Sequence, residues 1–362
     1  MGNREQEFQH KLAQVRALMA EKEIANLLIT QAHHFSWLTG GGENFVFLAN
    51  TDGAAPLLIT QEAVYLVSNN IESVRMTAEE LDGLPIEDAH HLWYLSGDEQ
   101  RAHFDNLAPG PIYKDTELQA DLDRLHTPLH DNEIERYRWL GAQAEHALRQ
   151  ACQSVEPGMT EYQAAALVAQ AAYANRLYPV LILAAADERI AHFRHPLPTQ
   201  KTIGRSLMLV LCARRHGLIA NLTRMVSFGE PSSELRQKHD AVCRVDAALI
   251  LASTPGKNYG EVFQTGTQAY EREGFAHEWK LHHQGGPTGY QGRYFKATAQ
   301  SMQTVQAGQA IAWNPSIAGT KSEDTILVAQ SGPEVLTAAQ DWPLFHAETS
   351  LGALPRPDIL IK

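Results

Sequence analysis

Four side chains that can do chemistry fall at matched spacings in two apolar stretches of the sequence. Cys212 and Asn221 are nine residues apart, and so are Asn314 and Glu323. Thiol, amide and carboxylate groups can bind a metal ion, hold a substrate or exchange a proton. Because side chains that converge from two rigid hairpins suit a central site, we expect these four residues to meet.

The elements that would position them occur twice. A helix is predicted from about residue 133 to 155, followed by Pro157-Gly158 and a second helix. The same order returns with a helix at about 233–251, followed by Pro255-Gly256 and another helix. Self-similarity at a fixed spacing indicates an internal duplication.

Both halves end in strands that turn back on themselves. The turns are expected at His216-Gly217 in the first half and at Ala318-Gly319 in the second. Thr160 followed by Gln163 is typical of a capping box at the start of a helix. We therefore expect two hairpins related by a pseudo-twofold axis.

A smaller domain precedes the duplicated part. An amphipathic helix is predicted over residues 4–22 and a short buried strand over 24–30, with two further strands after it. The fold class predicted is α/β (α+β). Residues 1–128 form a small mixed α/β domain, and residues 129–362 form the duplicated domain.

Composition narrows the class of protein. The formal net charge of −12 disfavours nucleic-acid binding, since such a chain repels phosphate backbones. The three cysteines, Cys152, Cys212 and Cys243, are few, odd in number and far apart, which argues against a disulfide framework. The polar N-terminus and the lack of a long apolar run favour a cytoplasmic protein with no membrane partner.

The opening of the second domain, DNEIERYRWLGAQAEHALRQACQSVEPGMTEYQAAA, resembles the pita-bread family of creatinase, aminopeptidase P and prolidase. The similarity covers nearly the whole chain, including the smaller first domain. It implies a creatinase-like N-terminal domain and a C-terminal pita-bread domain. It also implies a homodimer in which the N-terminal domain of one subunit closes the cleft of its partner.

Active peptidases of that family bind two divalent metal ions through two Asp, one His and two Glu. Here the first Asp falls on Cys212 (Val210 if the hairpin is counted as full length), and the second on Asn221 in Asn-Leu-Thr-Arg. The His falls on His283 in His-His-Gln-Gly-Gly. The two Glu fall on Asn314, in Asn-Pro, and on Glu323.

Three of the five metal-ligand positions of the family therefore carry a thiol or an amide in place of a carboxylate, and only His283 and Glu323 are retained. Bridging carboxylates offset the repulsion between two cations about 3.5–4 Å apart, and neutral amides do not supply that charge. We therefore expect no dinuclear centre and no cofactor. The alternative is one divalent ion on Cys212, His283 and Glu323, because zinc accepts sulfur, nitrogen and oxygen ligands.

Creatinase gives a metal-free precedent within the family, with a histidine as acid–base. Its histidine segment resembles the one that contains His195, which makes His195 the candidate for proton transfer. Arg293 occupies the place of an arginine that binds the substrate carboxylate. Glu323 is expected either to have a pKa raised by burial or to pair with Arg224 across the hairpins. Asn221 and Asn314 are expected to bind substrate.

Three hypotheses on function follow. The first is metal-independent hydrolysis of a C–N bond in a small carboxylate-bearing amide, amidine or peptide-like molecule, with His195, His283 and Glu323 as catalytic residues. The second is an X-Pro metallopeptidase with altered ligands. The third is a silent ligand- or peptide-binding relative. Thiol acyl transfer by Cys212, His283 and Asn314 is a further alternative.

Overall fold

The computed structural model describes residues 2–362, with side-chain environments from residue 4 onward. The chain divides into two compact units. Unit 1 comprises the residues up to Glu133 together with His216–Leu218, and unit 2 comprises Ile134–Arg215 and Ile219–Lys362. The division falls inside helix α6 (Asp131–Ser154), whereas the sequence placed it between residues 128 and 129.

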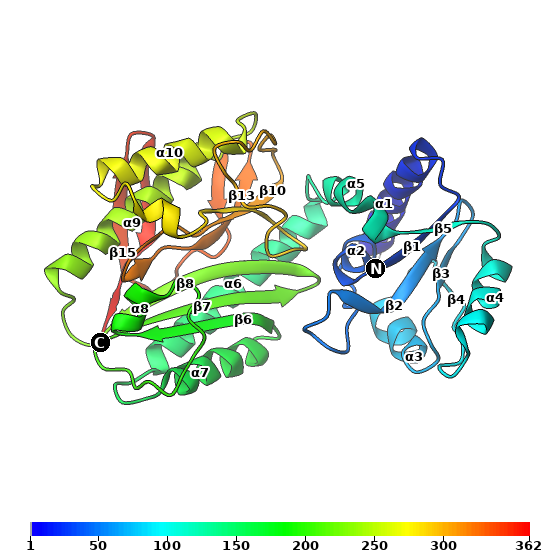
Figure 1. Cartoon of the computed structure of the whole chain (residues 1–362), viewed down its shortest axis with the longest axis horizontal. Coiled ribbons are helices and arrows are strands. Elements are labelled where there is room, and N and C mark those ends of the chain that lie inside the picture. The colour runs from blue at the N-terminus through cyan, green and yellow to red at the C-terminus, as the bar shows by residue number, and fades with distance from the viewer. Residues whose placement is uncertain (1) are drawn as a thin grey trace. The chain divides into compact units, whose positions relative to one another are not determined.

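Unit 1 is a mixed α/β domain built on one five-stranded sheet in the order β4-β3-β2-β1-β5 (Figure 1). Strands β1 and β2 pair in antiparallel fashion, while β5 runs parallel to β1. The elements are α1 (Gly2–Glu21), β1 (Asn26–Gln31), α2 (Ala32–Leu38), β2 (Asp52–Ile59), β3 (Val64–Leu66), α3 (Ser73–Arg75), η1 (Met76–Glu80), β4 (Glu87–Asp88), α4 (Gly97–Leu107), β5 (Ile112–Lys114), η2 (Asp115–Leu118) and α5 (Gln119–Leu125).

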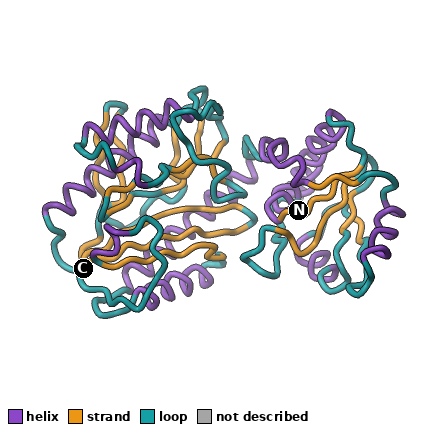
Figure 2. The backbone as a smooth tube through the Cα atoms, viewed as in Figure 1, coloured by secondary structure: helices purple, strands orange, loops and turns teal. Residues whose placement is uncertain are grey.

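Unit 2 contains the predicted duplication. Helices α7 (Glu161–Ala174) and α10 (Tyr259–Arg272) lie on opposite sides of the unit, with strands between them (Figures 1 and 2). The first half holds α6, α7 (Glu161–Ala174), β6 (Tyr178–Ala186), α8 (Glu188–His192), β7 (Ser206–Arg215) and β8 (Leu218–Ser227). The second half holds α9 (Ser233–Ala252), α10 (Tyr259–Arg272), η3 (Glu278–Leu281), β9 (Gly285–Thr288), β10 (Gln309–Trp313), β11 (Ser316–Ile317), β12 (Thr320–Lys321) and β13 (Asp324–Ala329). The C-terminal strands are β14 (Gly332–Val335), β15 (Leu344–Thr349), β16 (Gly352–Pro357) and β17 (Leu360–Ile361).

The two halves of unit 2 build matching four-stranded sheets. One has the order β17-β8-β7-β6 and the other β14-β13-β10-β9, so β6, β7 and β8 correspond to β9, β10 and β13. The turns before the second helix of each half also match. Gly158 donates its backbone N–H to Ile203, and Gly256 donates to Val305. Both glycines have positive φ, which side chains disfavour.

The local signals at the helix and hairpin ends are confirmed. Thr160 caps α7 and Gln163 completes the capping box. The β7–β8 turn at His216-Gly217 has positive φ at both residues, as a tight two-residue hairpin requires. In the second half, Trp313 pairs with Asp324 at the end of the β10–β13 ladder. Asn314 and Glu323 are the next two opposite positions beyond that pair. No helix among the described residues is long and apolar enough to cross a membrane.

A chain of buried charges ties the two sheets of unit 2 together. Arg224 of β8 donates to Asp324 of β13 over 3.1 Å. Arg356 of β16 binds the other oxygen of Asp324 and also contacts Asp246 of α9 at 2.7 Å. All four side chains are nearly inaccessible to solvent. Because each charge has an opposite neighbour, the network stabilises one arrangement of these four elements.

We predict that replacing Arg356 with Met destabilises the protein by about 3–5 kcal/mol, since two carboxylates would stay buried with too little positive charge. The matched control is Arg138→Met, because Arg138 pairs with Glu334 at side chains that are 52% and 37% exposed. That change should cost no more than about 1 kcal/mol. Urea denaturation of both variants measures the difference. Equal losses would contradict the assigned role of the network.

Candidate active site

His195 lies in the loop that follows α8, and an ion pair fixes this loop to the second half of unit 2. The neighbouring Arg194 donates to Glu278 of η3 over 2.6 Å and contacts the hydroxyl of Ser316 at 3.3 Å. Glu278 also accepts the backbone N–H of Ala318. The loop carrying His195 is therefore held against η3 and the β11–β12 turn.

His282 and His283 lie between η3 and β9, where a buried glutamine holds the backbone. The amide of Gln284 donates to the carbonyl oxygens of His282 (2.6 Å) and Trp279 (3.2 Å). Its side-chain oxygen accepts from the hydroxyl of Tyr270 on α10. With both ends of the amide engaged, the two histidines project in fixed directions.

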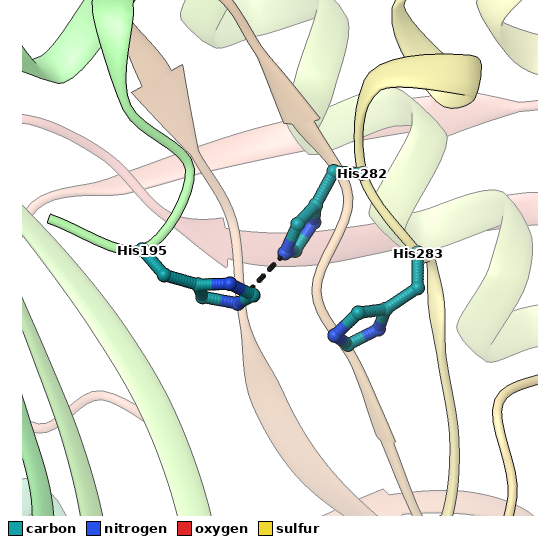
Figure 3. Close-up of side chains that lie close together, drawn as sticks. All are labelled: His195, His282 and His283. Carbon is teal, nitrogen blue, oxygen red and sulfur yellow. Dashed lines mark hydrogen bonds between the residues drawn. The ribbon is translucent and has the colours of Figure 1, made fainter.

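The three imidazole rings form one cluster (Figure 3). The Nε2 atoms of His195 and His282 are 3.1 Å apart, so one ring donates a hydrogen bond and the other accepts it. The rings of His282 and His283 stack with centroids 4.5 Å apart. The Nδ1 atoms of His282 and His283 are buried and have no hydrogen-bond partner among the described residues. Each of these two atoms therefore has unused hydrogen-bonding capacity.

Burial and nearby cations favour the neutral form of all three rings. Burial, followed by Lys321 and His283, lowers the pKa of His282 to about 2. Burial and then Arg293 and Lys296 lower the pKa of His283 to about 4. The pKa of His195 is also lowered, chiefly by partial burial and then by Lys321. At neutral pH the three rings are therefore uncharged, and each has one nitrogen that can accept a hydrogen bond.

Glu323 lies beside the cluster as a fully engaged carboxylate. Its Oε2 atom accepts from Lys321 Nζ (2.6 Å) and from the hydroxyl of Thr223 (2.7 Å). Its Oε1 atom accepts from Arg293 at 3.2 Å. Burial opposes ionisation, but Lys321 and Arg293 outweigh it and lower the pKa of Glu323 to about 2.

Two expectations about Glu323 are therefore wrong. Its pKa is lowered and not raised, because two cations contact the buried carboxylate. Its partner is not Arg224, which instead pairs with Asp324, the next residue along the strand. Successive side chains of a strand point to opposite faces, so a shift of one residue separates the structural pair from the site.

Arg293 and the two asparagines occupy the same region but differ in their contacts. Arg293 binds Glu323 through one nitrogen and leaves its buried Nε without a partner among the described residues. Asn314 Oδ1 is also buried and unpartnered in the described part of the chain. Asn221 donates to the hydroxyl of Thr288 at 3.3 Å. Substrate contacts by Arg293, Asn221 and Asn314 stay predictions.

Cys212 does not join the histidines. Among the described residues, the groups whose ligand atoms lie within 4.8 Å of one another include His195, His282 and His283, but not the expected set of Cys212, His283 and Glu323. Burial raises the pKa of the Cys212 thiol to about 12. The thiol is thus protonated at neutral pH, which argues against thiol acyl transfer.

Sequence reasoning missed Lys321, Thr223 and the role of His282. Lys321 precedes Glu323 by two residues, and residues two apart share one face of a strand. That alternation was available as a signal. His282 stands beside His283 in the sequence. Only the position of the loop that carries His195 determines that His282, and not His283, forms the hydrogen bond with His195.

Comparison with known proteins agrees with the fold. The model of metallopeptidase family M24 matches residues 135–330, more than half of the chain. The chain therefore belongs to metallopeptidase family M24. An uncharacterized peptidase of Staphylococcus aureus strain MW2 is 30% identical over 124 residues, which cover 33% of this chain and 35% of that protein. The chain thus spans about a third of the length of the curated relatives it matches.

Solved structures share the fold over nearly the whole chain, which confirms the pita-bread prediction. A prolidase from Pyrococcus horikoshii OT3 has a TM-score of 0.74 and 19% identity, covering 91% of this chain and 99% of its own. An Xaa-Pro dipeptidase from Bacillus anthracis has a TM-score of 0.73 and 16% identity, covering 98% and 100%. At this level of identity the likeness concerns the fold alone.

The family name implies metal ions, but the residues here do not fit a dinuclear centre. Each oxygen of Glu323 already binds a protein cation, Lys321 or Arg293. Two more divalent ions would add about four positive charges next to these groups, with two asparagines in place of carboxylates. By distance alone, the three histidines could hold one ion. The positive charges of Lys321, Arg293 and Lys296 act on the same rings and oppose it.

We predict that His282 and His283 stay neutral at pH 5.5, whereas an unshifted histidine is largely protonated there. The unfolded chain binds protons at these residues near pKa 6.5, but the folded chain does so only near 2 and 4. The contribution of these two neutral rings to stability is therefore complete above pH 6.5. It is lost as the pH falls from 6.5 through about 4 for His283 and about 2 for His282. Histidine-selective NMR titration measures the pKa values. Ionisation of both rings near pH 6.5 would refute the prediction.

We also predict that the protein retains less than a stoichiometric amount of metal. After dialysis against manganese, cobalt or zinc, followed by removal of free ions, plasma mass spectrometry should find far below one equivalent. Retention of two equivalents would restore a dinuclear centre. Retention of one, lost on His282→Ala, would place an ion on the histidines.

Proposed function

We propose that this protein hydrolyses a C–N bond in a small, carboxylate-bearing amide, amidine or peptide-like molecule without a metal ion. The observation that carries the proposal is the neutral imidazole pair, His195 and His282, whose Nε2 atoms are 3.1 Å apart beside the engaged carboxylate of Glu323. Because His282 holds one nitrogen of His195 in a hydrogen bond, the other nitrogen of His195 can act as a base toward a water molecule or a substrate group.

His195 is the proton-transfer residue of this proposal. It is more exposed than His282 and so meets solvent and substrate first. It would take a proton from the attacking water and return it to the leaving nitrogen. His282, through its hydrogen bond, selects the tautomer of His195 and acts as a positioning residue. The unpartnered Nδ1 of His283 would contact the substrate.

The charges around the cluster support an anionic substrate. Lys321 and Arg293 bring two positive charges, while Glu323 brings one negative charge, so an excess of one positive charge remains. The exposed Lys296 adds to the positive field at His195 and His283. A substrate carboxylate near the unpartnered Nε of Arg293 would balance this excess. Glu323 itself serves to balance charge.

Dipeptides are the first substrates to assay, because the structural neighbours include a prolidase and an Xaa-Pro dipeptidase. Free dipeptides carry both an amide bond and a carboxylate. N-acyl amino acids and amidines with a carboxylate complete the panel. Each is tested with a chelator and with added manganese, so that dependence on metal, which the second hypothesis requires, is measured directly.

We predict that His195→Ala lowers kcat by about 10²–10⁴-fold on any substrate found, because the proton-transfer group is lost. The matched control is His192→Ala, three residues earlier and also exposed. It should keep nearly full activity. If His195→Ala is as active as the wild type, or if activity appears only with added metal, the proposed mechanism is wrong.

A further inference from the structure

The two oxygens of Glu323 each hold one protein cation. Oε2 binds the Lys321 ammonium group and Oε1 binds the Arg293 guanidinium group. By the family resemblance, this glutamate is one that would otherwise bind metal ions. In this chain, two side chains therefore supply the positive charge, fixed by covalent attachment to the fold.

The ammonium group of Lys321 retains unused donors. Its side chain is only 4% exposed, and among the described residues Glu323 is its one hydrogen-bond partner. An ammonium group has three N–H donors, so two remain available in a buried position. A buried donor without a partner is costly, which indicates a place for an acceptor from a ligand.

The fold brings this ammonium group next to the histidines. Lys321 on β12 pairs across the hairpin with Ser316 on β11. The hydroxyl of Ser316 contacts Arg194, the residue that precedes His195. The positive charge of Lys321 also lowers the pKa of His195 and of His282. The base and the cation are thus linked through Ser316 and Arg194, and they lie close enough for the charge of Lys321 to act on the imidazoles.

We propose that Lys321 is a catalytic residue that binds the oxygen of the scissile carbonyl and stabilises the negative charge that develops on it. This inference rests on the proposed function and narrows its substrate to a carbonyl amide, such as a peptide, over an amidine. The Nε–H of Arg293, which has no hydrogen-bond partner among the described residues, is a further donor of the same site. Preorganised donors of this kind act on charge that exists only in the transition state.

The reaction balances with water as the sole co-reactant. The water oxygen bonds to the carbonyl carbon while His195 takes one proton, and the carbonyl π electrons move onto the oxygen that Lys321 binds. The electron pair then returns, the C–N bond breaks, and the proton on His195 passes to the leaving nitrogen. The products are a carboxylic acid and an amine.

The test compares Lys321→Met with Lys238→Met, a change at a surface lysine that pairs with Glu234. Stabilisation of an oxyanion acts on kcat more than on KM, so Lys321→Met should lower kcat by about 10²–10³-fold with little change in KM. Lys238→Met should change neither. Urea denaturation of both variants checks folding. A Lys321→Met variant that is folded and keeps the wild-type kcat overturns the proposal.

A second variant separates a catalytic role from a structural one. In Lys321→Ala, added ethylammonium should restore part of kcat, while ethanol of similar size should not. Equal rescue by both would assign Lys321 a space-filling role and overturn the proposal. Lys321→Arg, which keeps the charge but moves it, should retain more activity than Lys321→Met.

Binding of methylphosphonate distinguishes failure of this inference from failure of the proposed function. Its anionic tetrahedral group resembles the charged intermediate, and NMR titration measures its affinity for wild type and Lys321→Met. If no amide is hydrolysed but binding depends on Lys321, the anion site stands and the hydrolase proposal falls. If binding is the same in both proteins and no amide is hydrolysed, both fall.

Discussion

The buried charge chain from Arg224 through Asp324 and Arg356 to Asp246 is the constraint on which the centre of unit 2 depends. It joins β8, β13, β16 and α9, so strands from both halves share one set of ion pairs. Residues adjacent to this chain form the site: Thr223 precedes Arg224, and Glu323 precedes Asp324. These two neighbours also form a bridge, with the backbone N–H of Thr223 donating to Glu323. The buried ion pairs on one strand face thus position the charged residues of the candidate site on the other face.

Burying these charges has an electrostatic cost, which explains why each of them has close partners of opposite charge. A buried carboxylate or ammonium group loses several kcal/mol of hydration, and only close opposite charges and hydrogen bonds offset that loss. Glu323 has three such partners, and its lowered pKa shows that they outweigh its burial. His282 and His283 avoid the cost of a buried charge because their lowered pKa values keep both rings neutral. Fixed charges and neutral imidazoles therefore lie side by side in the same site.

Much of the fold followed from local patterns in the sequence. The nine-residue spacing from Asn314 to Glu323, with a turn expected at Ala318-Gly319, indicated a hairpin, and the structure contains one there. The turn at His216-Gly217 and the cap at Thr160 follow from backbone preferences that act within a few residues. Such signals are readable because they do not depend on distant partners.

The contacts of the site depended on information that no local pattern holds. Arg224 has two candidate carboxylates, Glu323 and Asp324, in adjacent positions, and only packing decides which one faces it. Cys212 has the right residue type for a ligand, yet its distance from the imidazoles is a property of the assembled sheets. The approach of His195 to His282 depends on the ion pair between Arg194 and Glu278, which are 84 residues apart.

The histidine cluster is not symmetric with respect to the duplication. His195 follows β6 in the first half, whereas His282 and His283 precede β9, the strand that corresponds to β6 in the second half. The three rings therefore come from positions that are not equivalent in the two halves. Neither half contains the cluster by itself, so the candidate site forms only when both halves of the duplicated domain are folded against each other.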